Sequence, residues 1–357
     1  MARPLLLHFL MLSVFTCIVT STNALASPTF IDLAEVGLQY TPSKTITELE
    51  LSFPSSAQKT EQDSLVEARF DVDEQGKPFN YHFVRTSGTD IFDTLLAKNL
   101  DNWVLQPAMH NGKPIIQRNK TYSAIYRTLH PSGRNPAPEM RRHFQRYYSY
   151  VRDLFDRGEY ADFEVHMGNL DKANIANFIE SRQLFLLKNA YLNKTNGSIH
   201  DKIYTLEKAL KGEQRTEKGE KLMLKIKASL MALYAENNQL SKARMLYYEI
   251  ANSEHGNSLA VKLGSSLDDI ESKLVAGDAI AAQVMVFDTE LLNHALSRHS
   301  FSLSANTKIE HIELSCDDFK VSFDYVPDAI YITPTDWGLC VLTVQAPARS
   351  VISINEA

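Results

Sequence analysis

Alternating apolar and polar residues predict two strands in the first third of the chain. Val66, Ala68, Phe70 and Val72 alternate with polar positions in "LVEARFDV", and "FNYHFVRTSG" alternates in the same way. Between these runs, "DEQGKP" has the composition of a tight turn in which Gly76 takes a positive φ. The pattern therefore predicts a β-hairpin.

After this hairpin the apolar spacing changes to that of a helix. Apolar residues from Phe92 to Trp103 lie on one helical face, and Asp90 and Asp93 stand where helix-capping residues are found. Pro107 cannot continue the helix, and "HNGKPI" predicts a polar turn. "NKTYSAIYRTL" is then a third strand, so the predicted order is strand, strand, helix, strand.

A proline-rich linker, residues 130–139, leads to a helical pattern over residues 140–300. Turn signals at Gly158, Gly197, Asn238 and Gly277 are spaced by 39, 41 and 39 residues. Each is followed by an apolar stretch that we expect to be helical, for example "SKARMLYYEI" and "AIAAQVMVF". This regular spacing predicts stacked αα-hairpins.

One of these hairpins resembles a tetratricopeptide repeat. "LMALYAENNQLSKARMLYYE" places Leu230, Tyr234, Ala243 and Tyr247 where that family carries leucine, tyrosine, alanine and an aromatic residue. The spacing of the turn signals exceeds the family's period of about 34 residues, so the other hairpins resemble the family only in their helical-hairpin architecture. We expect close helix packing at the small residues Ala243 and Ala282.

The last segment, residues 301–357, returns to the alternation of strands. "FKVSFDYV", "AIYIT", "GLCVLTVQA" and "SVISI" are short strand-like runs, and prolines separate them. The segment is therefore expected to be a small antiparallel β domain.

The first 26 residues have the pattern of a secretory signal peptide. One basic residue precedes an apolar run from Leu5 to Val19, and Ala24 and Ala26 offer a small-residue cleavage site before Ser27. The run is shorter than the about 20 apolar residues of a membrane-spanning helix. We expect cleavage between Ala26 and Ser27; the alternative is an uncleaved membrane anchor.

Charge and cysteine content narrow the function further. Without residues 1–26, 36 Lys and Arg stand against 43 Asp and Glu, a net charge of −7 without a basic block. This balance argues against nucleic acid as a partner. In an oxidising compartment, Cys316 and Cys340, 24 residues apart in strand-like surroundings, are expected to form a disulfide.

No residue pattern predicts catalysis or a metal site. The chain lacks Gly-x-Ser-x-Gly, a phosphate loop and a dinucleotide fingerprint. His294 and His299 are five residues apart, which does not place both on one helical face as zinc ligands. Asp71 and Asp73 are similar to a calcium loop, but His82 stands where a bidentate glutamate is needed. We expect no enzyme activity, no cofactor and no metal.

Residues 45–129 resemble the TonB C-terminal domain family. "FPSSA" stands for the family's Tyr-Pro-x-x-Ala, and "TSG" is followed by Phe92 and Asp93, which open the helix. "WVLQPAMHNGKPI" matches its tryptophan, Pro-Ala and Asn-Gly-x-Pro. The resemblance implies a ββαβ domain. The whole chain is then expected to be multidomain α+β, with this domain, an αα-hairpin solenoid and a small β domain.

The same resemblance implies a location in the Gram-negative envelope, here the periplasm. The long Pro/Glu/Lys-rich spacer of a TonB protein has no counterpart in the chain. We therefore expect an adaptor that binds envelope proteins, such as a TonB-dependent outer-membrane transporter or another component of a TonB complex. The alternatives are a membrane-anchored energy transducer and a peptidoglycan-binding module.

In that family the domain captures an extended partner segment as an added strand at the sheet edge. The resemblance implies that this edge is the final strand, with the partner-binding residues Tyr122, Ser123, Ala124, Ile125, Tyr126 and Arg127. The alternative is that the following helical segment covers the strand. The concave surface of the helical hairpins is a second candidate.

Overall fold

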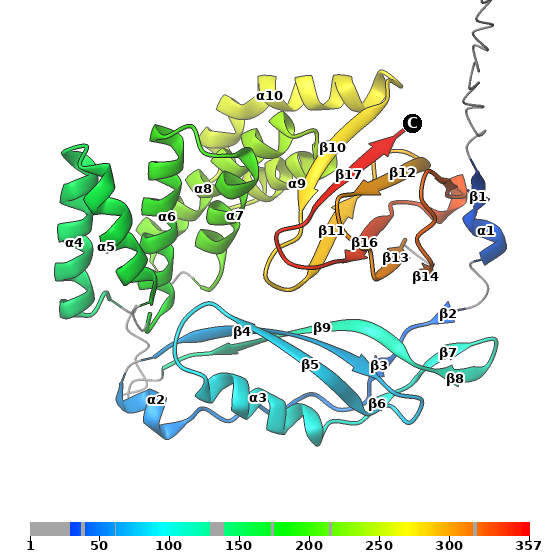
Figure 1. The fold of residues 1–357 in the computed structure, drawn as a ribbon, viewed down its shortest axis with the longest axis horizontal. Coiled ribbons are helices and arrows are strands. Elements are labelled where there is room, and N and C mark those ends of the chain that lie inside the picture. The colour runs from blue at the N-terminus through cyan, green and yellow to red at the C-terminus, as the bar shows by residue number, and fades with distance from the viewer. Residues whose placement is uncertain are drawn as a thin grey trace, which may run out of the picture.

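The structure is a computed structural model, and it describes residues 29–36, 40–60, 62–128, 139–172, 175–213, 216–316 and 320–357. A three-stranded sheet with one long helix forms one layer, and a helical array and a β sandwich lie side by side across the other face of that sheet (Figure 1). The fold is mixed α+β, as the sequence predicts.

The first layer has the predicted order of strand, strand, helix, strand. Its main elements are β4 (Ser64–Val72), β5 (Pro78–Arg85), α3 (Ile91–Asp101) and β9 (Gln117–Tyr126). The strands are antiparallel in the order β5-β4-β9. Shorter elements accompany them: β2 (Tyr40–Thr41), β3 (Lys44–Thr45), α2 (Ser55–Lys59), β6 (Leu105–Gln106), β7 (Ala108–His110) and β8 (Lys113–Ile115).

The alternating apolar residues of β4 form the core under α3. Val66, Phe70 and Val72 are fully buried with Phe92 and Leu96 of the helix. The opposite face of β4 carries Glu67, Arg69 and Asp71, because successive strand residues point to opposite faces. One face of the sheet is therefore apolar and the other is polar.

The turn between β4 and β5 requires a glycine, as predicted. Gly76 has a φ of +82°, and a Cβ at this position would lie 1.8 Å from the carbonyl oxygen of Leu105. The amide of Leu105 in turn donates to the Gly76 carbonyl at 2.9 Å. Asp73 accepts from the amides of Gln75 and Lys77, so its carboxylate organises a hairpin turn.

Helix α3 ends before Trp103, and the chain then returns through a tight hairpin. Asn111 and Gly112 both have positive φ values, 50° and 73°, between the paired residues His110 and Lys113. Two central residues with positive φ are what a two-residue hairpin of type I′ needs. The polar turn predicted from the sequence therefore leads the chain back towards β9.

The helical array contains seven helices in the described residues. They are α4 (Arg142–Asp156), α5 (Tyr160–Lys172), α6 (Phe178–Lys194), α7 (Ile199–Leu210), α8 (Glu217–Glu236), α9 (Leu240–Ala251) and α10 (Asn257–Val275). The predicted turns at Gly158, Gly197 and Asn238 each join two helices. Ala243 is fully buried between helices, as expected. The likeness to tetratricopeptide repeats stays a prediction.

The helical prediction is wrong after Val275. "AIAAQVMVF" forms the strand β10 (Ile280–Met285) instead of a fourth hairpin, and β11 (Leu291–Ala295) follows it. Ala282 therefore packs inside the sandwich and not between two helices. The burial of Ile280, Ala282 and Val284 alternates with exposed neighbours, which is the period of a strand.

The β sandwich packs a five-stranded sheet, in the order β1-β15-β12-β17-β10, against a four-stranded sheet, β11-β16-β13-β14. Its remaining strands are β12 (Ser300–Ala305), β13 (His311–Ser315), β14 (Lys320–Phe323), β15 (Ile330–Ile332), β16 (Val341–Gln345) and β17 (Val351–Glu356). Leu303, Ile312, Leu342 and Ile354 lie in the shared core.

The first described strand belongs to this sandwich, which the sequence does not predict. β1 (Phe30–Asp32) pairs in parallel with β15, and it is followed by the short helix α1 (Leu33–Val36). Leu33 is completely buried in the sandwich core. A segment more than 240 positions before β10 thus supplies an outer strand of the C-terminal part.

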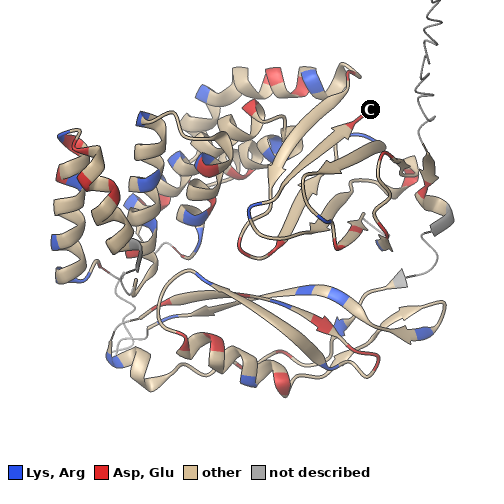
Figure 2. Cartoon of the chain, viewed as in Figure 1, with Lys and Arg blue, Asp and Glu red and all other residues tan. Residues whose placement is uncertain are grey.

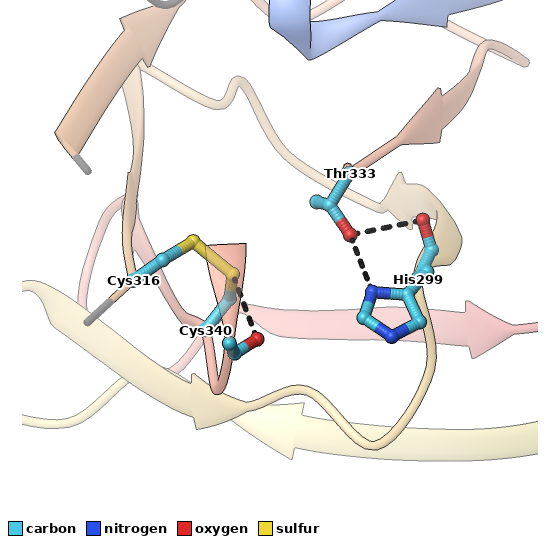
Figure 3. Close-up of a disulfide and its surroundings, with 5 residues drawn as sticks. His299, Cys316, Thr333 and Cys340 are labelled. Atoms are coloured by element: carbon cyan, nitrogen blue, oxygen red, sulfur yellow. Dashed lines mark hydrogen bonds between the residues drawn. A yellow bond between two sulfur atoms is a disulfide. The ribbon is translucent and has the colours of Figure 1, made fainter. Parts of the chain in front are cut away.

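The expected disulfide between Cys316 and Cys340 is present (Figure 3). It joins the residue after β13 to the residue before β16, and the Cys340 sulfur lies 3.8 Å from the Gly338 carbonyl oxygen. His299 and Thr333 are linked nearby, where the Thr333 hydroxyl donates to the His299 carbonyl at 3.0 Å.

Several sequence predictions lie outside the described residues. These are the signal peptide 1–26 with the cleavage site at Ala26 and Ser27, and the linker 130–139 apart from Glu139. Among the helices that the structure describes, none combines the length and apolar character needed to cross a membrane.

Candidate functional site

The predicted binding residues lie on the edge strand of the first layer. Tyr122, Ser123, Ala124, Ile125 and Tyr126 belong to β9, which pairs with β4 on one side and has no strand on its other side among the described residues. Backbone groups on such an edge are available for pairing with another strand.

The hydrogen-bond alternation identifies which β9 residues face the open side. Leu65 of β4 directs both its amide and its carbonyl to Thr86, next to β5. Alternate residues of an antiparallel strand bond to opposite neighbours, so Val66 and Ala68 bond to Ala124 and Tyr122 of β9.

The residues between these partners on β9 therefore direct their amides and carbonyls away from β4. They are Thr121, Ser123 and Ile125, which stand opposite Arg69, Glu67 and Leu65 in the register. All three are exposed, and Ile125 retains 40% of its accessible surface. The open edge thus presents three positions for strand pairing, one at every second residue of β9.

The other side chains of β9 are part of the domain core. Ala124 and Tyr126 are buried, and the Tyr126 ring lies 5.0 Å from that of Phe92 on α3. Burial raises the pKa of the Tyr126 hydroxyl well above its usual value. These side chains hold β9 in place and do not offer a surface to a partner.

Arg127 differs from the other predicted site residues because it already has a partner. It lies just after β9 and forms an ion pair with Glu213, between α7 and α8. This contact ties the end of β9 to the helical array. The side chain is nevertheless about half exposed.

The polar face of the sheet contacts the rest of the chain through residues that the sequence does not identify as an interface. Glu67 pairs with Lys211 after α7, and His82 Nε2 lies 2.8 Å from the carbonyl oxygen of Asp288. Asn119 donates from Nδ2 to the side chain of Gln345 on β16 at 2.9 Å. Only the alternation of polar residues on β4 hinted at this second interface.

These contacts lie on the polar face of the sheet and not along the open edge of β9. The array and the sandwich contact the polar face of the sheet, yet Thr121, Ser123 and Ile125 stay exposed. Figure 2 shows that Lys and Arg are interspersed with Asp and Glu over all three parts.

Another sheet edge of the chain is treated differently. β10 is the outer strand of the five-stranded sheet, and Asn238 and Asn237 donate from Nδ2 to the carbonyls of Ala281 and Gln283. These side chains, from the turn between α8 and α9, occupy carbonyls that would otherwise be free for pairing. No described residue makes such a side-chain bond to the open backbone groups of Thr121, Ser123 or Ile125.

We find no metal-binding arrangement in the described part of the chain, where no group of three His, Cys, Asp or Glu side chains converges. His294, whose spacing from His299 does not predict a zinc ligand, is fully buried and contacts Glu356 at 2.9 Å. The Glu356 carboxylate also accepts from the amides of Ser297 and Arg298. This constellation fixes the C-terminal strand inside the molecule.

Comparison with known proteins assigns the first layer to a family. A family model described as Gram-negative bacterial TonB protein C-terminal matches residues 50–122. A solved structure of the TonB2 protein from Vibrio anguillarum aligns with 24% identity over 29% of this chain and 95% of that chain, with a TM-score of 0.21. A search of curated proteins finds no match. The family-model match identifies residues 50–122 as a TonB C-terminal domain.

Proposed function

We propose that this chain is a non-enzymatic interaction protein of the bacterial periplasm, which captures an extended segment of a partner protein at the β9 edge. The open edge carries the proposal: Thr121, Ser123 and Ile125 direct backbone amides and carbonyls away from β4 while their side chains remain exposed. The match to a TonB C-terminal family supports an envelope location.

Strand addition explains how such an edge recognises a partner. Main-chain hydrogen bonds to the three open positions provide the affinity, and alternate side chains of the captured strand provide the specificity. The inner side chains Ala124 and Tyr126 keep β9 fixed on the domain core. Binding of a partner strand therefore does not require β9 to become ordered.

The partner we propose is a component of TonB-dependent transport, either an outer-membrane transporter or another protein of a TonB complex. An extended, periplasm-exposed segment of such a protein supplies the chemistry that an edge strand binds. The chain would act as an adaptor whose helical array and β sandwich hold the TonB C-terminal domain in one orientation.

A proline on the open side of β9 tests this directly. Ser123→Pro removes an amide that faces away from β4, so the strand keeps its internal bonds while the edge loses a donor. The probe is a synthetic peptide with the sequence of the periplasm-exposed N-terminal segment of a TonB-dependent transporter from the same bacterium. Binding is measured by isothermal titration calorimetry.

We expect Ser123→Pro to weaken peptide binding about tenfold or more, since at least one hydrogen bond and close strand contact are lost. Ser123→Ala is the matched control, because it keeps the amide, and its affinity should equal that of the wild type. Circular dichroism establishes that both variants are folded. Equal binding by Ser123→Pro and the wild type would place the partner elsewhere on the chain.

A further inference from the structure

A cavity of about 520 Å³ lies where the three parts of the chain meet. Glu67, Arg69, Thr121 and Ser123 of β4 and β9 form its floor, and residues of α7, α8, α9 and the β10–β11 segment form the rest of its wall. Small-molecule sites typically enclose roughly 300–1,000 Å³. The cavity is therefore large enough for a small ligand.

The floor of the cavity lies over two of the three strands of the sheet. It includes β4 and β9 but no residue of β5. Thr121 and Ser123 line the cavity and are nevertheless exposed, so it opens to solvent along β9. A small molecule has a path into it from this side.

Much of the wall is apolar. It includes Ile203, Leu230, Leu246, Val284, Leu292 and the ring of Tyr234. These residues come from five elements: α7, α8, α9, β10 and β11. Such a surface favours the burial of an apolar ligand body.

Most charges of the cavity wall are matched within the protein. Arg69 pairs with Glu290 at 2.7 Å, and Lys211 pairs with Glu67. Lys208 pairs with Asp288 at 2.8 Å. The positive charges of Arg69, Lys208 and Lys211 are therefore already paired with acidic groups of the protein.

Lys242 on α9 is the exception among the described cationic residues that line the cavity. Its ammonium has no hydrogen bond or ion pair to any described residue, and it lies 5.2 Å from the centroid of the Tyr234 ring. The neighbouring Glu207 carboxylate accepts a hydrogen bond from the Tyr234 hydroxyl. Burial lowers the pKa of Lys242, although the negative charge of Glu207 acts in the opposite direction.

We propose that this cavity binds a small amphipathic carboxylate, whose carboxylate accepts hydrogen bonds from Lys242 and whose apolar body packs against Leu246 and Val284. A hydrogen bond between two charged groups in a partly desolvated site is stronger than one between neutral groups. An ammonium that lies in an apolar wall and forms no ion pair or hydrogen bond with a described residue therefore selects an anionic head, and the wall selects an apolar tail.

Decanoate serves as the probe, and 1-decanol is its uncharged counterpart of the same chain length. Isothermal titration calorimetry with the full chain measures saturable binding of each, below the concentration at which decanoate forms micelles. Lys242→Met removes the ammonium and keeps the length of the side chain. Lys262→Met, at an exposed position on α10, is the matched control.

We expect one decanoate site in the wild type, and a loss of about tenfold or more in affinity for Lys242→Met, since one charge-assisted hydrogen bond is removed. Lys262→Met should bind decanoate like the wild type, and decanol should bind more weakly than decanoate. Leu246→Trp, which fills the cavity, should also reduce binding. Decanoate binding that is absent, or equal in the wild type and Lys242→Met, contradicts the proposal.

Discussion

Arg69 on β4 and Glu290 in the β10–β11 turn form an ion pair of 2.7 Å, although 221 positions separate them in the sequence. Arg69 also donates from Nε to the carbonyl of Thr289 at 3.1 Å and from Nη1 to Asn119 at 3.2 Å. The Arg69 side chain is only 8% exposed, whereas that of Glu290 is 39% exposed. The guanidinium thus joins the TonB C-terminal domain to the β sandwich.

Replacing Arg69 by methionine should lower the free energy of unfolding by about 1–3 kcal/mol, because several hydrogen bonds of a buried charged group are lost. Urea unfolding followed by tryptophan fluorescence measures the change. Arg152→Met is the control: its pair with Asp156 is largely exposed, and we expect a loss of about 0.5 kcal/mol or less. Equal losses in the two variants would show that the Arg69 contacts contribute little.

Trp103 should be essential for the TonB C-terminal domain. The indole is 5% exposed, lies 5.4 Å from the Tyr122 ring, and donates from Nε1 to the carbonyl of Thr47 at 2.8 Å. Trp103→Ala leaves a cavity and should cost about 3–5 kcal/mol in thermal or urea unfolding.

Trp103→Phe separates the ring from its hydrogen bond. It keeps most of the apolar volume and leaves the Thr47 carbonyl without its donor, so we expect a smaller loss of about 1–3 kcal/mol. A phenylalanine variant as unstable as the alanine variant would mean that the indole hydrogen bond, and not ring packing, is decisive.

The Cys316–Cys340 disulfide should stabilise the sandwich through the unfolded state. It closes a loop with a sequence separation of 24 residues, and the chain-entropy model assigns about 3 kcal/mol to a loop of this size. The double variant Cys316→Ser/Cys340→Ser should therefore unfold at lower urea concentration than the oxidised wild type. The wild type in reducing agent is the matched comparison, and its midpoint should fall to that of the variant.

Asp288 should make the stability depend on acid pH. Burial alone would raise the pKa of this carboxyl, but hydrogen bonds from Lys208 and Tyr204 and the charges of Lys208 and Arg349 lower it below its usual value of 3.8. A lowered pKa in the folded state means that the stabilisation is fully present above the unfolded value and is lost as the pH falls through the folded value.

The variant Asp288→Asn isolates this contribution. The difference in unfolding free energy between the wild type and the variant should be constant near neutral pH and should shrink as the pH falls below about 3.8. Urea unfolding at a series of pH values gives the difference. A gap that stays constant down to pH 2 would contradict a role for the ionised carboxylate.

The N-terminus of the mature chain distinguishes an adaptor from an anchored energy transducer. Residues 1–26 have the pattern of a signal peptide, so we expect the periplasmic fraction to contain a chain that starts at Ser27. Intact mass and N-terminal sequencing of the protein from fractionated cells measure this. A membrane-bound chain that retains Met1 to Ala26 would overturn the adaptor proposal.

Local patterns were sufficient for the first layer of the fold. The alternation of β4, the glycine turn at Gly76, the apolar stripe of α3 and the Asn111–Gly112 turn each predict the element that forms. They succeed because the residues that decide these elements are neighbours in the chain. The same holds for α4 to α9, where turn signals separate amphipathic helices.

The failure after Val275 has a physical cause. "AIAAQVMVF" is a short apolar run, and such a run is compatible with a buried helix or a buried strand. Pairing with β17, more than 60 positions later, selects the strand. The parallel pairing of β1 with β15 is equally invisible locally, because the two strands are about 300 positions apart.

The sequence by itself therefore determined the TonB C-terminal domain, its edge strand, the helical array and the disulfide, because each depends on residue types at short spacing or on one cysteine pair. Only the tertiary structure decided which face of that domain is covered, by bringing Glu67 and Arg69 to Lys211 and Glu290. It also placed Lys242 in the wall of a cavity shared by three parts. Contacts between distant segments depend on how whole elements pack, and no local pattern of residues encodes that packing.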